Sequence, residues 1–317
     1  MNNKIDVLIP IFNVERYLKQ CLDSIINQAF NDIHIICIND GSTDNSSKIL
    51  HEYAKKDNRI EIIEKDNCGY GAALNSGLDI ATAPYIGIVE PDDFIDSLNY
   101  YHLYDLAQKT NQPDIVKFAY FDFFENEDGT QKLLSSQSSS VPSHIYPFRI
   151  SEYPDILLYH PSIWSGIYSL NFIKKNNIRF VEAPGAAWTD NPFFIESLCN
   201  AEKIIWSNQK HYYYRRTNPT SSSNLIKDCS VPLQRGLELL EFIKKHPQTA
   251  QVENAIYKRC IIYIDVVIHS DFYNSSEQNE LINRIISNMS KLDLKSEYYT
   301  EREKTIYTLL KKVGELK

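Results

Sequence analysis

The first half of the chain alternates short apolar runs with amphipathic segments. The apolar runs predict strands at Ile5–Ile9, Ile33–Ile38, Ile60–Ile63, Tyr85–Val89 and Ile115–Tyr120. Between the first two runs, apolar residues recur at helical spacing in a stripe that contains Val14, Leu18, Cys21 and Ile25. Continuous apolar strands separated by such helices predict an α/β fold, a doubly wound and mostly parallel sheet covered on both faces.

Further helices are expected after Thr43 or Asp44, through Leu74 and Leu78, and over about residues 97–109. From Phe121 to Ile150 the alternation breaks down, and the serine-rich stretch Ser135–Ser140 predicts a mobile excursion. After about Asp228 the apolar spacing is helical to the end of the chain. The sequence therefore predicts a sheet-based region followed by a helical one.

Polar segments follow four of the predicted strands. They are Pro10–Glu15, Asn39–Asp44, Asp66–Gly71 and Glu90–Asp93. In a parallel sheet, ligands bind beyond the carboxyl ends of the strands, and these four segments share that edge. We therefore expect a ligand site there.

The segment Glu90-Pro91-Asp92-Asp93 places three carboxylates at the exit of a buried strand. Three carboxylates so close together repel one another unless a cation lies between them. Hard oxygen ligands suit Mg²⁺ or Mn²⁺. A bound cation can in turn hold the diphosphate of a nucleotide-activated substrate. Taken alone, the cluster fits a solvated acidic turn equally well.

Composition narrows the class of protein. The 317 residues carry a net charge of -8, which argues against nucleic acid as a partner. The six cysteines are scattered, without the close pairs of a zinc site, and fit a reducing compartment. An apolar strand begins almost at once, and no apolar run approaches the length of a membrane span. We expect a soluble, cytoplasmic protein.

Four ordered motifs resemble those of the family 2 glycosyltransferases. They are Val7-Leu8-Ile9-Pro10-Ile11-Phe12-Asn13-Val14-Glu15, Asn39-Asp40-Gly41-Ser42-Thr43-Asp44, Asn67-x-Gly69 with Ala73-x-Asn75-x-Gly77, and Glu90-Pro91-Asp92-Asp93. The resemblance implies a GT-A fold, a nucleotide-diphospho-sugar donor and inversion at the anomeric carbon. It covers about residues 1–220, with a donor half over 1–120 and an acceptor half over 121–220, and leaves a helical region over 221–317. The sugar, the acceptor and the linkage stay undetermined.

The nucleotide is expected along the first three strand ends. A carboxylate at Asp40 can accept the imide N–H of uracil, which favours UDP, although Asp40 can also merely cap a turn. Pro10, Phe12 and Asn13 can lie near the base, whereas Glu15 either reaches the nucleoside or starts the helix. The resemblance adds Asp66, Asn67 and Gly69 to this group, and glycine lets backbone approach a ligand closely.

The donor sugar and phosphates are expected against Asn75, Glu90 and Asp93, with Asp92 as the metal ligand; the resemblance implies these roles. Two positions depart from the family pattern. Glu90 replaces the usual first aspartate, and Leu74 stands where an arginine is common. Phosphate neutralisation must then come from Mn²⁺ or Mg²⁺ and from another basic group.

The general base is expected in Trp188-Thr189-Asp190-Asn191-Pro192, which resembles the family's acidic segment before an apolar helix. Asp190 can take the proton of an acceptor hydroxyl as that oxygen attacks the anomeric carbon. The alternative is that Asp190 serves as the N-cap of the helix.

Basic and aromatic residues follow in Lys210–Arg216. Arg215 or Arg216 can clamp the leaving diphosphate, which compensates for Leu74. His211 is either a further metal ligand or structural, and Thr217–Ser223 can close over the donor as a lid.

The last helix has an apolar face that can touch a membrane surface, pair two copies or pack on its own domain; it is formed by Ile306, Leu309, Leu310, Val313 and Leu316. A peripheral position at the inner face of the membrane fits a lipid-linked acceptor. Two other functions stay open: a metal-dependent sugar nucleotidyltransferase, and a glycan-binding protein without activity.

Overall fold

The computed structural model describes residues 3–126, 128–141, 143–186, 188–219, 228–289 and 298–315, with the backbone alone for residues 137, 144, 145 and 309–315. Contacts divide the chain into two compact units. The first consists of Met1–Arg149 and His160–Pro219, and the second of Ile150–Tyr159 and Thr220–Lys317. Each unit is described separately below.

The first unit is built on one sheet, whose strands within the described residues are β1 (Ile5–Ile11), β2 (Ile33–Asp40), β3 (Ile60–Lys65), β4 (Tyr85–Ile88), β5 (Phe94–Ile95), β6 (Ile115–Glu125), β7 (Gln131–Ser135), β8 (His144–Phe148), β9 (Gly166–Ser169) and β10 (Ile204–Arg215). Their order is β3-β2-β1-β4-β9-β6-β10-β5, with β7 beside β6 and β8 beside β10. β9 runs antiparallel to β4 and β6, whereas β3, β2, β1 and β4 are mutually parallel, as are β6 and β10. The expected mostly parallel α/β sheet is confirmed.

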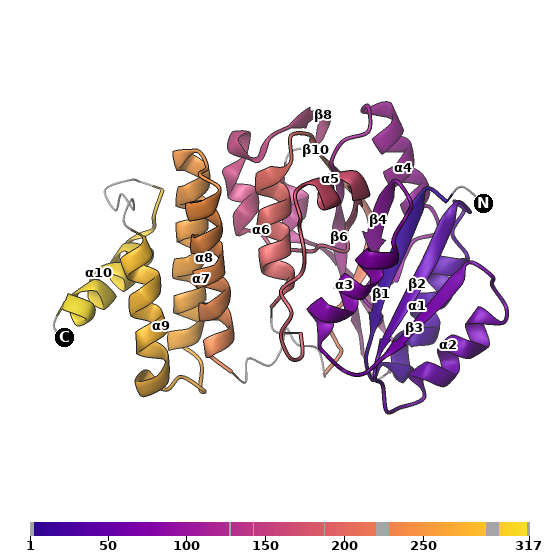
Figure 1. Ribbon diagram of the computed structural model, residues 1–317, viewed down its shortest axis with the longest axis horizontal. Coiled ribbons are helices and arrows are strands. Elements are labelled where there is room, and N and C mark those ends of the chain that lie inside the picture. Colours follow the sequence, from indigo (N-terminus) through magenta and orange to yellow (C-terminus); the bar gives the residue numbers. More distant parts are fainter. Residues whose placement is uncertain are drawn as a thin grey trace. The chain divides into compact units, whose positions relative to one another are not determined.

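The helices of this unit are α1 (Glu15–Ile26), α2 (Ser46–Ala54), α3 (Tyr70–Ile80), α4 (Asn99–Lys109), α5 (Leu170–Lys175) and α6 (Asp190–Asn200). α1 buries Leu18, Cys21, Leu22 and Ile25, as its apolar stripe predicts. α3 packs on β1 and β2, α2 packs on β2 and β3, and α4 packs on β6 (Figure 1). Loops at the carboxyl ends of the parallel strands are thereby left on one edge.

Four strands, β1, β2, β3 and β6, run further than their apolar runs indicate. β1 continues through Pro10, whose register partner is Ile38 on β2. The register with β4 runs only to Leu8, so the end of β1 has a strand on one side, where proline is tolerated. β6 continues to Glu125 because β7 pairs with it as a hairpin.

The serine-rich stretch was expected to be a mobile excursion, but part of it is buried. Ser136 and Ser138 are buried, and their hydroxyl oxygens lie 2.7 Å apart. The backbone N–H of Ser136 donates to the carbonyl of Tyr120 at 3.0 Å. Ser136 therefore exchanges hydrogen bonds with Tyr120 in the middle of β6, which composition alone does not reveal.

The second unit contains α7 (Ser230–Lys245), α8 (Ala250–Ile268), α9 (Ser275–Asn288), α10 (Glu301–Glu315) and the short 3-10 helix η3 (Pro154–Leu158). Figure 1 shows α7 and α8 side by side, and α9 also contacts α7. These helices lie in the region whose apolar spacing is helical.

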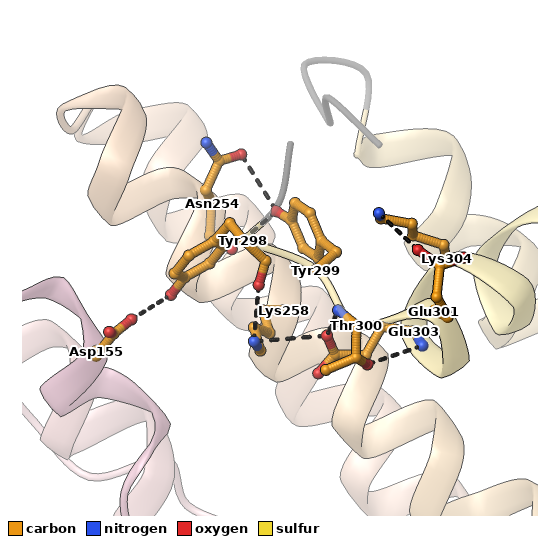
Figure 2. A network of polar contacts seen from close by, with 9 residues as sticks. All are labelled: Asp155, Asn254, Lys258, Tyr298, Tyr299, Thr300, Glu301, Glu303 and Lys304. Carbon is orange, nitrogen blue, oxygen red and sulfur yellow. Dashed lines mark hydrogen bonds and ion pairs between the residues drawn. The ribbon is translucent and has the colours of Figure 1, made fainter. Parts of the chain in front are cut away.

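Segment Ile150–Tyr159 is held in this unit by polar contacts with α8 and with the chain before α10. The Tyr298 hydroxyl donates to Asp155 at 2.7 Å, and the Lys258 ammonium donates to the carbonyl of Tyr298 at 2.9 Å (Figure 2). Arg259 donates to the carbonyl of Tyr159 at 3.0 Å. These bonds explain why a segment from the middle of the chain joins the C-terminal helices.

None of the helices in the described part of the chain combines the length and the apolar character needed to cross a membrane. The apolar face expected on α10 falls largely outside what the structure describes, because the side chains of Leu309, Leu310 and Val313 and the whole of Leu316 are not covered. The same holds for residues 220–223 of the expected lid.

Candidate active site

The loops after β1 and β2 hold each other. Asn13 has a φ of 49°, a conformation that asparagine tolerates, and its side-chain oxygen accepts the N–H of Thr43 at 2.7 Å. Glu15 accepts the N–H of Asn45, at the start of α2, at 2.9 Å. Asp44 returns the contact by accepting the N–H of Glu15 at 2.9 Å. Asn13 and Glu15 therefore shape this edge through contacts between the loops, and Glu15 supports the starts of two helices.

Asp40 ends β2 as a buried carboxylate. Its Oδ1 accepts the Lys65 ammonium at 2.9 Å and the N–H of Cys68 at 3.0 Å, and its Oδ2 accepts the N–H of Gly69 at 2.8 Å. Lys65 is the last residue of β3 and the register partner of Asp40. Sequence reasoning missed Lys65, although the final positions of two adjacent parallel strands are neighbours.

Pro10 and Phe12 differ in exposure at the end of β1. Pro10 is buried within the strand, whereas the ring of Phe12 is 49% exposed. Asp66 and Asn67 are exposed in the loop after β3. Phe12 thus offers an aromatic surface at the edge where Asp40 ends the neighbouring strand.

Gly69 and Gly71 allow another segment of the protein, Val181–Gly185, to pack directly against them. A Cβ on Gly69 would lie 2.1 Å from the carbonyl oxygen of Ala183, and one on Gly71 would lie 2.0 Å from that of Val181. The first N–H of α3, on Tyr70, donates to the carbonyl of Gly185 at 2.9 Å. The start of α3 is therefore closed by segment Val181–Gly185, so the close approach expected at Gly69 is made by the protein's own backbone and not by a ligand.

Asn75 fixes the same segment. Its amide nitrogen donates to the carbonyl of Phe180 and to Glu182, both at 2.9 Å, and its oxygen accepts the N–H of Phe180 at 3.0 Å. Asn75 is buried. The side chain expected to line the donor instead clamps α3 to the chain that leads to Asp190.

Glu90 lies between Tyr70 and two other carboxylates. Burial raises its pKa to about 8; the hydrogen bond from the Tyr70 hydroxyl lowers the pKa, and the charges of Asp92 and Asp190 raise it. The coupling places Asp190 in the same electrostatic cluster as the acidic motif, although the two are about a hundred residues apart in sequence. The charge of Arg215 acts on the same motif, where it lowers the pKa of Asp92 against the stronger effect of burial.

Asp93 and Asp92 have different partners. Asp93 is buried, and it accepts the Tyr212 hydroxyl at 2.8 Å and the N–H of Arg215 at 2.7 Å. Burial raises the pKa of both carboxyls, and the charge of Asp92 raises that of Asp93 further. Asp92 is partly exposed and accepts the Asn218 amide at 2.7 Å. Of the two, Asp92 is the carboxylate that a ligand can reach.

Arg215 and Arg216 are neighbours with opposite environments. Arg215 is buried, donates to Glu125 and to the carbonyl of Asp92, both at 2.9 Å, and lies 4.7 Å from the centre of the Tyr17 ring. Arg216 is 40% exposed, with Asp122 at 3.7 Å. The guanidinium of Arg215 is used within the protein, so Arg216 is the one available to a ligand.

Asp190 is the first residue of α6, and Thr189 occupies the N-cap position. Asn191 donates to one oxygen of the Asp190 carboxylate at 3.0 Å. The N-cap alternative for Asp190 is therefore not what this structure contains.

His211 does not join the acidic cluster. It pairs with Asp96 at 3.4 Å and stacks on His102, with ring centres 4.9 Å apart. Burial lowers its pKa. Across the described ranges, no three histidine, cysteine or acidic side chains converge as a complete metal site, so any cation would need oxygen atoms from its ligand as well.

A family model described as Glycosyl transferase family 2 matches residues 6–180. The chain belongs to this family of glycosyltransferases. The uncharacterized glycosyltransferase EpsJ of Bacillus subtilis is 30% identical over 230 residues, which cover 70% of this chain and 63% of that protein. The poly(ribitol-phosphate) beta-glucosyltransferase of Bacillus spizizenii is 32% identical over 220 residues, 67% of this chain and 32% of that protein. The matches thus span less than two thirds of these relatives.

Solved structures agree with the fold of this family 2 chain. Residues 1–349 of S. aureus TarS in complex with UDP-GlcNAc superpose with a TM-score of 0.69 at 18% identity, covering 91% of this chain and 82% of that one. At that identity the likeness shows the fold alone, and the expected GT-A fold is confirmed.

Proposed function

We propose that the chain is an inverting glycosyltransferase that moves a sugar from a UDP-sugar to a hydroxyl of a bacterial surface glycan or a lipid-linked acceptor. The proposal rests on the family match and on the acidic motif Glu90–Asp93 that follows β4, where the charges of Asp92 and Asp190 add to the effect of burial in raising the pKa of Glu90. The UDP-GlcNAc bound to TarS and the poly(ribitol-phosphate) acceptor in the name of a relative support the donor and acceptor classes.

In this proposal the nucleoside lies at the end of β2. Asp40 accepts the imide N–H of uracil, and Phe12 offers its exposed ring to the base. Asn13, Glu15, Asn75 and Gly69 act indirectly, by holding the loops of the site in place.

The residues present fit a divalent cation at Asp92. Glu90, Asp92 and Asp93 are neighbours in one motif, and burial raises the pKa of each carboxyl, so a nearby positive charge would favour their ionised forms. Asp92 would hold Mn²⁺ or Mg²⁺ through carboxylate oxygen, and the cation would neutralise the diphosphate as it leaves. Asp93 and Glu90 position the motif through Tyr212 and Tyr70.

Asp190 is proposed as the general base. Its carboxylate takes the proton from the acceptor hydroxyl as that oxygen forms the bond to the anomeric carbon and the bond to the diphosphate breaks. One base and one displacement give inversion, without a covalent sugar–enzyme intermediate. Arg216, which directly follows β10, is the basic group proposed for the leaving diphosphate.

A donor panel tests the proposal. The purified protein is incubated with several UDP-sugars, with Mn²⁺ or with EDTA, and release of UDP is followed with and without candidate acceptors. We expect release from at least one UDP-sugar with Mn²⁺, and a loss of at least about 100-fold with EDTA or in Asp92→Ala. Equal rates with EDTA and in Asp92→Ala would remove the metal role from this site.

A further inference from the structure

The ends of β2 and β3 present an ion pair whose two halves differ in accessibility. Asp40 and Lys65 are the last register pair of these strands, with Oδ1 and Nζ 2.9 Å apart. The Asp40 side chain is 4% exposed, whereas that of Lys65 is 20% exposed. A ligand at this edge can therefore contact the Lys65 ammonium and the small exposed part of the Asp40 carboxylate.

Both partners retain hydrogen-bonding capacity. A carboxylate has about four lone-pair positions, and within the described residues Asp40 uses two on Oδ1 and one on Oδ2. Lys65 has three N–H groups; it donates one to Asp40 and one, at 3.4 Å, to the carbonyl of Asp66, and it also interacts with the thiol of the exposed Cys68, a weak acceptor. The pair thus offers an acceptor beside a donor.

That arrangement complements one edge of a pyrimidine. Uracil has an N–H at position 3 flanked by two carbonyl oxygens, whereas cytosine has a bare nitrogen at position 3 and an amino group at position 4. An acceptor at position 3 with a donor beside it fits uracil, but it sets a carboxylate against the bare nitrogen of cytosine. Phe12 follows Ile11, whose register partner is the residue before Asp40, so an exposed ring flanks the pair.

We propose that Lys65 is a specificity-determining residue, which donates to the carbonyl oxygen beside N3 and with Asp40 selects uracil over cytosine. This inference rests on the proposed function, because it assumes that the nucleotide of the donor binds at this edge. It assigns to Lys65 a direct contact with the base rather than only the support of Asp40.

Calorimetric titration with UDP and with CDP, both in the presence of Mn²⁺, tests the inference. We expect the wild type to bind UDP at least tenfold more tightly than CDP. Lys65→Met should weaken UDP binding about tenfold, equal to about 1.4 kcal/mol, and CDP binding less than about twofold. Lys65→Arg keeps a donor and should keep the preference.

Lys203→Met is the matched control. Lys203 is exposed and directly precedes β10, so it lies at the amino end of a strand that is parallel to β6 and away from the carboxyl ends. The control removes the same charge and should bind both nucleotides like the wild type.

Three outcomes separate this inference from the proposed function. A wild type that binds UDP and CDP equally overturns the role of Lys65, whatever the variants do. Equal loss of both nucleotides in Lys65→Met leaves Lys65 as a support for Asp40 and also overturns it; if that variant does not melt cooperatively, loss of preference in Lys65→Arg decides against the inference. A wild type that binds neither nucleotide contradicts the proposed function instead.

Discussion

At the scale of single residues, environment decides what a charged side chain can do. Arg215 is the last residue of β10, and Arg216 directly follows the strand. One is buried against Glu125 and the ring of Tyr17, and the other is 40% exposed. Arg215 therefore holds the acidic motif, whereas Arg216 is the arginine that we propose contacts the ligand.

Substitution of the two arginines should separate stability from turnover. Arg215→Lys loses the planar group that contacts Glu125, Gln20 and the carbonyl of Asp92, and we expect a loss of about 2–4 kcal/mol in the free energy of unfolding. Arg216→Ala should leave that free energy within about 0.5 kcal/mol and lower turnover at least tenfold. Urea unfolding and donor turnover measure both; unchanged turnover in Arg216→Ala would remove this residue from the site.

Lys117 gives a pH-dependent prediction away from the site. It is fully buried, its ammonium donates to the carbonyl of Ser162 at 2.6 Å, and burial lowers its pKa to about 7. The unfolded chain therefore binds more protons than the folded one between about pH 7 and the usual lysine pKa of about 10.4, so folding stability due to this group rises with pH there.

The variant Lys117→Met lacks that titration. From pH 7 to pH 10, the free energy of unfolding of the wild type should rise relative to the variant, by up to about 4 kcal/mol. Urea unfolding at three pH values measures the difference, in which the contributions of other groups cancel. A difference that does not change with pH would contradict the lowered pKa of Lys117.

The sequence could identify residue types at the site but not their partners. Asp40, Asp92, Asp93 and Asp190 stand at strand and helix ends that periodicity locates. The sequence did not identify the residues that bond these carboxylates, because their roles depend on which side chain they face. They are Lys65, Tyr70, Tyr212 and Asn218. Asn75 shows the reverse error: a polar residue in a donor motif binds the chain's own backbone.

At the scale of elements, the start of α3 connects two parts of the candidate site. One part contains Glu90, and the other is the segment that leads to Asp190. Gly69 and Gly71 let segment Val181–Gly185 lie directly on the helix, and Asn75 clamps Phe180 from the next turn. This segment leads to α6, whose first residue is Asp190. Close packing at α3 therefore fixes the approach of Asp190 to Glu90.

Gly71→Ala tests this connection without changing any polar group. Alanine suits a helix better than glycine by about 1 kcal/mol, but here its Cβ would lie 2.0 Å from a backbone oxygen and must displace the segment. We expect turnover to fall at least about 100-fold. The free energy of unfolding should fall by about 1–3 kcal/mol.

Gly236→Ala in α7 is the matched control. The nearest atom to its added Cβ is 3.4 Å away, so helix propensity should dominate and stability should rise by up to about 1 kcal/mol. Thermal melts and turnover are compared for both variants. Full turnover in Gly71→Ala would show that this connection does not position Asp190.

Element prediction succeeded where one residue pattern covers a whole element. β1, β2, β3, β4 and α1 follow from their apolar residues, whereas β10 was not predicted. The second half of β6 could not be predicted in this way. It depends on pairing with β7, and its residues alternate between buried and partly exposed. The burial of Ser136 and Ser138 was not predicted for the same reason. The composition of a loop does not show which backbone groups the loop will bond.

At the scale of the whole molecule, the topology explains why distant motifs form one site. β1, β2, β3 and β4 end at the same edge because they are parallel, and β10 brings Tyr212 and Arg215 to Asp93 from the far half of the chain. The net charge of -8 and the raised pKa values of the acidic motif together favour a site completed by a cation. The acidic edge is therefore where we propose that metal, donor and base come together.

The most direct test of this account is turnover of the best UDP-sugar by Asp190→Asn, with donor affinity measured on the same sample. Asparagine keeps the shape of the side chain but cannot take a proton, so we predict a fall in turnover of at least about 100-fold and a donor affinity within about threefold of the wild type. Asp79→Asn, whose carboxylate pairs with Arg179 at the surface, is the control and should keep full turnover. Wild-type turnover in Asp190→Asn would contradict the central claim that this carboxylate is the base of the reaction.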